Sequence, residues 1–105
     1  HKKDWQLWEK QIQHIASAVS KIPGVKPEIH VPDIANHVPS LNVSWDENLV
    51  KTTPDEVRQR LRDGHPSIET VGGGESVNIT TWMLNPGEER IVAQRLKGIL
   101  SEASS

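Results

Sequence analysis

The spacing of apolar residues changes along this chain, and that change constrains the fold more than any other feature of the sequence. In residues 5–22 the apolar side chains recur at steps of three and four, which puts them on one face of a helix. They are Trp8, Ile12, Ile15, Val19 and Ile22. In residues 26–31 and 40–45 the period falls to two, as in strands with one buried face. We therefore expect a helix over residues 5–21, then two strands, with Ile29 turned inward and His30 outward.

A second helix is predicted by the residues that would start it. Thr53 can cap the helix, Pro54 suits its first position and Glu56 completes a capping box. The helix should run to residue 63. Gly64 should end it in the left-handed conformation that glycine adopts readily.

The last third of the chain predicts a hairpin and a third helix. Residues 67–71 and 76–83 flank the glycines at 72–74, and the second of these segments alternates as a strand does. A second capping box at residues 85–88 then introduces an amphipathic helix. Its defining residues are Ile91, Val92, Arg95, Leu96, Ile99 and Leu100.

The expected order of elements is therefore α-β-β-α-β-β-α. Strand pairs separated by helices favour an α+β fold, here a two-layer sandwich whose mostly antiparallel sheet has helices on one face. A length of 105 residues suits a single domain over residues 1–105.

The composition excludes several classes of partner and chemistry. Twelve Lys and Arg against fourteen Asp and Glu leave a net charge of −2, which provides no field for nucleic acid or for an anionic membrane. No run of apolar residues approaches the ~20 that a membrane helix needs. The chain has no cysteine, so a thiol nucleophile, a thiolate zinc site and a disulfide framework are all excluded.

The first residue leaves two interpretations open. The chain begins at His1, with no methionine and no signal-like apolar segment before the charged residues that follow. Such a beginning indicates either a cut in a longer protein, or a tag remnant or processed end ahead of an independent domain.

No self-contained active site is visible in the sequence. The five histidines show no helical i, i+4 pair and no metal-finger spacing, so no metal site is expected. The glycine run precedes a strand and not a helix, which argues against a phosphate-binding loop. No serine has the context of a nucleophile elbow, and no histidine completes a triad. We therefore assign no catalytic residue.

The chain has four tryptophans but no phenylalanine or tyrosine. Each indole buries a large area and needs a hydrogen-bond partner when it is buried. Trp8 and Trp45 fit the core, whereas Trp5 and Trp82 fall on accessible sides. The accessible pair indicates either a contact surface or two singly exposed rings.

Two segments resemble a known enzyme family. Residues 64–68 read GHPSI, and residues 82–93 read WMLNPGEERIVA at the start of the last helix. Both resemble the C-terminal end of pyridoxal-phosphate enzymes related to bacterial selenocysteine synthase and D-glucosaminate-6-phosphate ammonia lyase. The first helix and its proline-glycine end, the strand at 41–46 and the helix at 53–62 fit the same pattern. The resemblance therefore covers most of the chain.

The resemblance implies an aminotransferase-like fold of type I. In that fold a large domain carries the lysine that forms the cofactor Schiff base, and a small C-terminal domain closes over the active site. This chain looks like the small domain alone. None of its seven lysines resembles the cofactor lysine, so pyridoxal phosphate is expected in the parent enzyme and not on this domain by itself. The chain is thus expected to be inactive alone.

The same resemblance bears on the reaction and the partners. Selenocysteine synthases tend to carry an arginine in the last strand, whereas residues 78–83 contain none. This difference favours a lyase-like relative acting on a small amino acid over a tRNA-dependent transferase. The partner of the domain would be the large pyridoxal-phosphate domain of the same chain, in a cytoplasmic homo-oligomer.

Substrate contacts would come from loops that face the large domain. The residues proposed for this role are Asn36, His37, His65 and Trp82. The alternative is an independent α+β module that binds a protein partner through its exposed Trp and His residues, without catalysis. A fragment would expose Trp5 and Leu7 and should self-associate, which distinguishes the two hypotheses. A standalone hydrolase is disfavoured because no nucleophile and base can be named.

Overall fold

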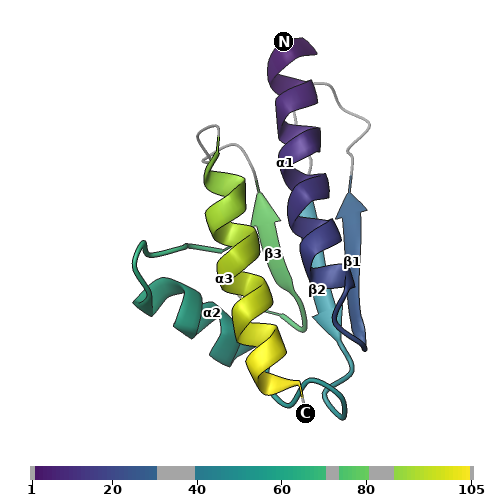
Figure 1. Cartoon of the computed structure of the whole chain (residues 1–105), viewed down its shortest axis with the longest axis vertical. Helices are drawn as coiled ribbons and strands as arrows, with labels where there is room; N and C mark the ends of the chain where they lie inside the picture. The colour runs from purple at the N-terminus through teal and green to yellow at the C-terminus, as the bar shows by residue number, and fades with distance from the viewer. Residues whose placement is uncertain (1, 31–39, 71–73, 81–86, 105) are drawn as a thin grey trace.

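The computed structural model describes residues 2–30, 40–70, 74–80 and 87–104, with side chains described from residue 6 onward. The helices are α1 (Lys2–Ser20), α2 (Pro54–Asp63) and α3 (Glu88–Ala103), and the strands are β1 (Val25–His30), β2 (Ser40–Trp45) and β3 (Val77–Thr80). The strands form an antiparallel sheet in the order β1-β2-β3. Figure 1 shows α1 and α3 side by side in front of this sheet, with α2 beside α3 and β3. The predicted α+β class is confirmed.

The core lies between the sheet and the two helices in front of it. Leu41 and Val43 of β2 are fully buried and pair with Ile79 and Val77 of β3, so one face of the sheet is apolar. Most of the residues predicted to lie on the inward faces of the first and last helices meet that face, whereas Ile91 is 39% exposed. Those at most 6% exposed are Ile12, Ile15, Val19, Ile22, Val92, Leu96, Ile99 and Leu100. The two predicted periodicities therefore select the residues that make the core.

The predicted order of elements is wrong at residues 67–70, which form no strand. Their polar groups are bound elsewhere, because the Ile68 amide donates to the Leu61 carbonyl (2.9 Å) and the Ser67 hydroxyl donates to the Arg62 carbonyl (2.6 Å). These hydrogen bonds join the segment to the end of α2 and not to β3. In the described part of the chain the order is α-β-β-α-β-α, and the expected hairpin is absent from it.

The helix ends match the sequence only in part. Thr53 caps α2 as predicted, since its hydroxyl accepts from the Glu56 amide at 3.2 Å. The carboxylate of Glu56 instead accepts from the Thr52 hydroxyl at 3.0 Å. Gly64 is extended (φ −82°) and not left-handed. The N-cap of α3 is Gly87 (φ +94°), and Asn85, with which the predicted capping box begins, lies outside the described residues.

Among the described strand residues, Ile29 departs furthest from its predicted burial. It is 42% exposed although it lies on the same side of β1 as Val25, which is buried. β1 is an edge strand of the described sheet, so Ile29 has a strand neighbour on one side only. The core therefore covers Val25 at the start of β1 and leaves Ile29, near its end, exposed to solvent. His30 is exposed, as predicted.

The tryptophans predicted to lie in the core are half-buried. Trp45 packs against the core, and its indole Nε1 donates to the Thr52 carbonyl at 2.9 Å. Trp8 is half-buried on α1. The side chains of Trp5 and Trp82 lie outside the described residues, so their predicted exposure stays a prediction.

Candidate functional site

The predicted substrate-binding residues divide into one that the structure describes and three that it does not. Asn36, His37 and Trp82 lie outside the described residues. His65 is exposed at the corner where the chain leaves α2. The described part of the candidate site is therefore that corner, residues 64–68.

Hydrogen bonds with α2 and with α3 hold the corner in place. Ser67 and Ile68 bind the last carbonyls of α2, as described above. From α3, the Arg95 guanidinium donates to the Pro66 carbonyl through Nη1 (2.8 Å) and to the Arg60 carbonyl through Nη2 (3.1 Å). The carbonyls in the last turn of a helix have no partner within it, so Arg60 and Arg62 supply acceptors that the helix itself cannot use. His65 thus projects from a corner held by four hydrogen bonds.

Gly64 makes room for this arrangement. A Cβ atom built at Gly64 would lie 1.7 Å from Nη2 of Arg95, well inside van der Waals contact. Because the backbone of Gly64 is extended, left-handed geometry is not the reason for glycine here. The reason is the close approach of the guanidinium to the main chain.

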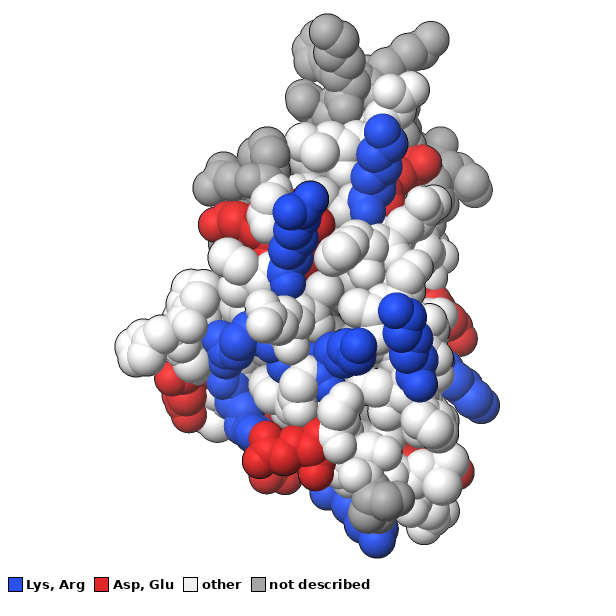
Figure 2. All heavy atoms as spheres, viewed as in Figure 1, with Lys and Arg blue, Asp and Glu red and all other residues white. Residues whose placement is uncertain are grey.

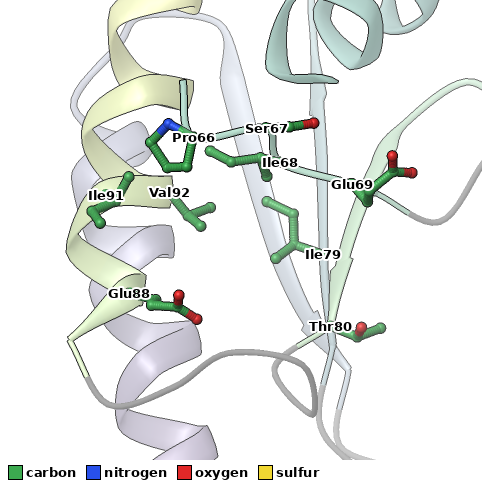
Figure 3. A pocket seen from close by; sticks show the side chains of 9 residues that line it. All are labelled: Pro66, Ser67, Ile68, Glu69, Ile79, Thr80, Glu88, Ile91 and Val92. Carbon is green, nitrogen blue, oxygen red and sulfur yellow. The ribbon is translucent and has the colours of Figure 1, made fainter. Parts of the chain in front are cut away.

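A pocket of about 230 Å³ lies between this corner, β3 and α3. Its lining comprises Pro66, Ser67, Ile68, Glu69, Ile79, Thr80, Glu88, Ile91 and Val92. Figure 3 shows the side chains of Ile68, Ile79 and Val92 pointing toward one another in its interior. Ile79 and Val92 are buried, while Ile91 is 39% exposed. The pocket therefore has an apolar floor and an open mouth.

The polar groups of the pocket can bind but do not form a reaction centre. Glu69 and Glu88 bring carboxylates, and Ser67 and Thr80 bring hydroxyls. The Ser67 hydroxyl donates its proton to the Arg62 carbonyl and not to a side-chain base of the lining. Complete ligand pockets hold roughly 300–1,000 Å³, so this smaller one suits part of a ligand, with the remainder held by another surface.

Next to the pocket, a hydrogen bond to Glu89 joins the start of α3 to α1. Its Oε1 accepts from the Gln11 side chain at 3.0 Å and from the Gly87 amide at 2.9 Å. Partial burial acts to raise the pKa of Glu89. The hydrogen bonds from Gln11 and from the amides of Glu89 and Gly87, together with the charge of His14, outweigh it and lower that pKa below its usual 4.5.

A second hollow lies at the N-terminus of α2, between Trp45 and the acidic groups Glu47, Asp55 and Glu75. Arg58 beside it is only 6% exposed and donates to the carbonyls of Ser76 (2.8 Å) and Gly74 (3.2 Å). It also pairs with Asp55. The Arg58 guanidinium thus holds the main chain just before β3 through these hydrogen bonds.

The described residues provide no metal site and no membrane span. No three histidine, aspartate or glutamate side chains gather among them in a way that could hold a metal ion. No helix within the described ranges is both long and apolar enough to cross a bilayer. On the described part of the face that carries α1 and α3, Figure 2 shows basic side chains separated by uncharged surface, with acidic groups beside several of them.

The fold can be compared with known proteins. No protein-family model and no curated protein matches the chain. Among solved structures the chain is similar to D-glucosaminate-6-phosphate ammonia-lyase, with a TM-score of 0.75 and 21% sequence identity over 90% of this chain. The chain shares its fold with part of this ammonia-lyase. It spans 26% of that enzyme's length, and at this identity the likeness concerns the fold alone.

Sequence reasoning placed Arg95 on the defining face of the last helix but missed its contact with the corner, and it missed the pocket. The signal for Arg95 is a charged residue inside the apolar stripe of the last helix, between Val92 and Ile99. A stripe position that carries a charge needs acceptors on a neighbouring element. No sequence signal indicated the pocket, because it forms only where residues 67–70 lie outside the sheet.

Proposed function

We propose that this chain is the small C-terminal domain of a pyridoxal-phosphate-dependent enzyme, a lyase or a transferase acting on an amino-acid-like substrate, and that it is inactive alone. One observation carries the proposal. The residues at 64–68 and 82–93 resemble the family of D-glucosaminate-6-phosphate ammonia lyase, and the fold independently resembles the same enzyme at a TM-score of 0.75. The lyase assignment is preferred because residues 78–83 carry no arginine.

The lysines of the chain do not fit a cofactor site. A lysine that forms a Schiff base is activated by desolvation or by a neighbouring cation. The lysines with described side chains, Lys10, Lys21, Lys26, Lys51 and Lys97, are all exposed and none lines the pocket. We therefore assign the cofactor to the large domain of a parent chain.

The pocket supports a role at an interface between domains. It has an apolar floor, an open mouth and too little volume for a whole ligand, as expected of a surface that closes over a site built mainly elsewhere. Within this proposal His65, at the rigid corner, contacts the substrate, together with Asn36, His37 and Trp82. The parent is expected to be a cytoplasmic homo-oligomer.

The first test is the mass of the native protein in its source, detected with an antibody against this domain and measured by mass spectrometry. We expect a chain several times larger than 11.7 kDa, whose purified form absorbs visible light as lysine-bound pyridoxal phosphate does. A native mass near 11.7 kDa would contradict the proposal. It would favour the independent protein-binding module instead, and the search would turn to a partner of the exposed side chains.

A further inference from the structure

Resting on the proposed function, we infer that Arg95 is a positioning residue for substrate binding: its guanidinium joins the 64–68 corner to α3 and so holds His65 and one wall of the pocket in place. The walls of the pocket come from elements far apart in the sequence. Pro66, Ser67 and Ile68 form one, and Ile91 and Val92 of α3 form the other (Figure 3). Arg95 lies one helical turn after Ile91 and reaches across to the Pro66 carbonyl.

The form of the contact suits positioning better than simple packing. Arg95 is half-buried, and it directs two donors of one planar group at two carbonyls, Pro66 and Arg60. A guanidinium is rigid, so two such bonds fix a direction as well as a distance. An apolar side chain at this position would fill space without fixing the corner.

Ile68 of the corner packs against the core, but the residues before it bury little apolar surface. His65, Pro66 and Ser67 are all exposed, so hydrophobic burial does not determine their position. Yet Gly64 is required there to admit the guanidinium. An exposed polar residue on a loop held by hydrogen bonds is the usual way in which a fold presents a binding group. The structure therefore assigns the Arg95 contact to the placement of His65.

The test uses the complete native chain that contains this domain, loaded with its cofactor. The variants are Arg95→Met, Arg95→Lys, His65→Ala and the double variant Arg95→Met/His65→Ala, with Lys97→Met as the matched control. Lys97 is an exposed cation on the same helix. The probes are small amino acids and D-glucosaminate 6-phosphate, and the one that changes the cofactor absorbance of the unaltered enzyme serves as ligand. That change gives Kd, and steady-state kinetics give kcat and KM.

We expect Arg95→Met to reduce kcat/KM about ten- to a hundredfold and to raise Kd, as misplacement of a binding group does. The double variant should lose no more than the greater of the single losses, because Arg95 acts through His65. Arg95→Lys keeps the charge but loses the planar pair of donor groups, and it should recover only part of the loss. Lys97→Met should behave as the unaltered enzyme does.

Two results would overturn the inference. One leaves the proposed function standing, and the other contradicts it as well. If Arg95→Met and Arg95→Lys lower Tm but leave Kd and kcat/KM unchanged, or if the losses for Arg95 and His65 simply add, Arg95 is structural only. The proposed function then stands. If the complete chain lacks the cofactor absorbance, or no probe changes it, the proposed function fails and the inference fails with it.

Discussion

At the scale of single residues, Gly64 and Gly98 should respond in opposite directions to the same substitution. A Cβ at Gly64 would lie 1.7 Å from the Arg95 guanidinium, whereas a Cβ at Gly98 would have no neighbour within 4 Å. Gly64→Ala must therefore displace the guanidinium, and we expect a loss of about 1–3 kcal/mol, because the hydrogen bonds from Arg95 to the Pro66 and Arg60 carbonyls are weakened. Gly98→Ala should stabilise α3 by up to about 1 kcal/mol, because alanine has the higher helix propensity.

Urea unfolding of the two variants measures both effects in one experiment. The midpoint should fall for Gly64→Ala and rise for Gly98→Ala, with unchanged slopes. In an Arg95→Ala background the penalty of Gly64→Ala should shrink, since the obstructing group is gone. Equal penalties in the two backgrounds would show that Gly64 does not serve the Arg95 contact.

Glu89 should make the stability of the chain depend on pH at the acid end. Its pKa is lowered in the folded chain, so the unfolded chain binds the proton more tightly. The stabilisation is then present above the ordinary value of 4.5 and is lost as pH falls through the lower folded value. A carboxylate at the start of a helix contributes ~0.3–1 kcal/mol.

We expect Glu89→Gln to be less stable than the unaltered chain by about that amount at pH 7, with the difference vanishing below pH 4.5. Thermal unfolding between pH 7 and pH 3 follows it. A Gln11→Met variant, which removes one donor to the carboxylate, should raise the Glu89 pKa, as carboxyl NMR titration measures. A titration of Glu89 at or above 4.5 in the unaltered chain would contradict this account.

At the scale of elements, β1 is an edge strand that Pro27 protects against further pairing. The Asp46 amide donates to the Gly24 carbonyl (3.0 Å), and in the antiparallel register this directs the main-chain groups of Pro27 and Ile29 away from β2. Pro27 has no N–H to offer on that outer side. Of these two residues only Ile29 presents an outward N–H. Proline at an edge facing solvent is a known protection against association.

Replacing Pro27 should therefore open the edge. Pro27→Val adds an outward N–H beside the exposed Ile29, and we expect association that grows with protein concentration while the fold is kept. Light scattering across a concentration series measures it. A Lys26→Val variant changes a neighbouring exposed residue without adding a donor and should associate less. Similar association of the two variants would attribute the effect to added hydrophobic surface.

The elements also show how far the sequence could predict the structure. The stripes of α1 and α3 and the strand at residues 40–45 were predictable because each buries a regular set of apolar side chains. Residues 67–70 were not, since their position depends on hydrogen bonds to Leu61 and Arg62 that no local pattern reveals. Of the predicted site only His65 lies in the described ranges, and the contact that holds its corner comes from α3, some thirty residues later.

At the scale of the whole molecule, the apolar face of α1 continues beyond the part that the core covers. Figure 1 shows the first turns of α1 extending past the ends of the strands. Gln11 and Ile12 are buried, but Leu7 and Trp8, one turn earlier on the same face, are only half-buried. An apolar stripe that the described part of the fold covers only in part is typical of a surface against which another part of a protein packs.

The isolated chain should therefore self-associate through the start of α1, whereas the complete parent should keep this surface covered. We expect sedimentation of the 105-residue chain to show a mass above 11.7 kDa that rises with concentration. Leu7→Gln should restore the monomer, because it removes apolar surface from the uncovered turn. Gln6→Glu, at an exposed position beside it, should not. A chain that stays monomeric at all concentrations would count against the domain hypothesis, since an independent module covers its own apolar faces and a separated domain does not.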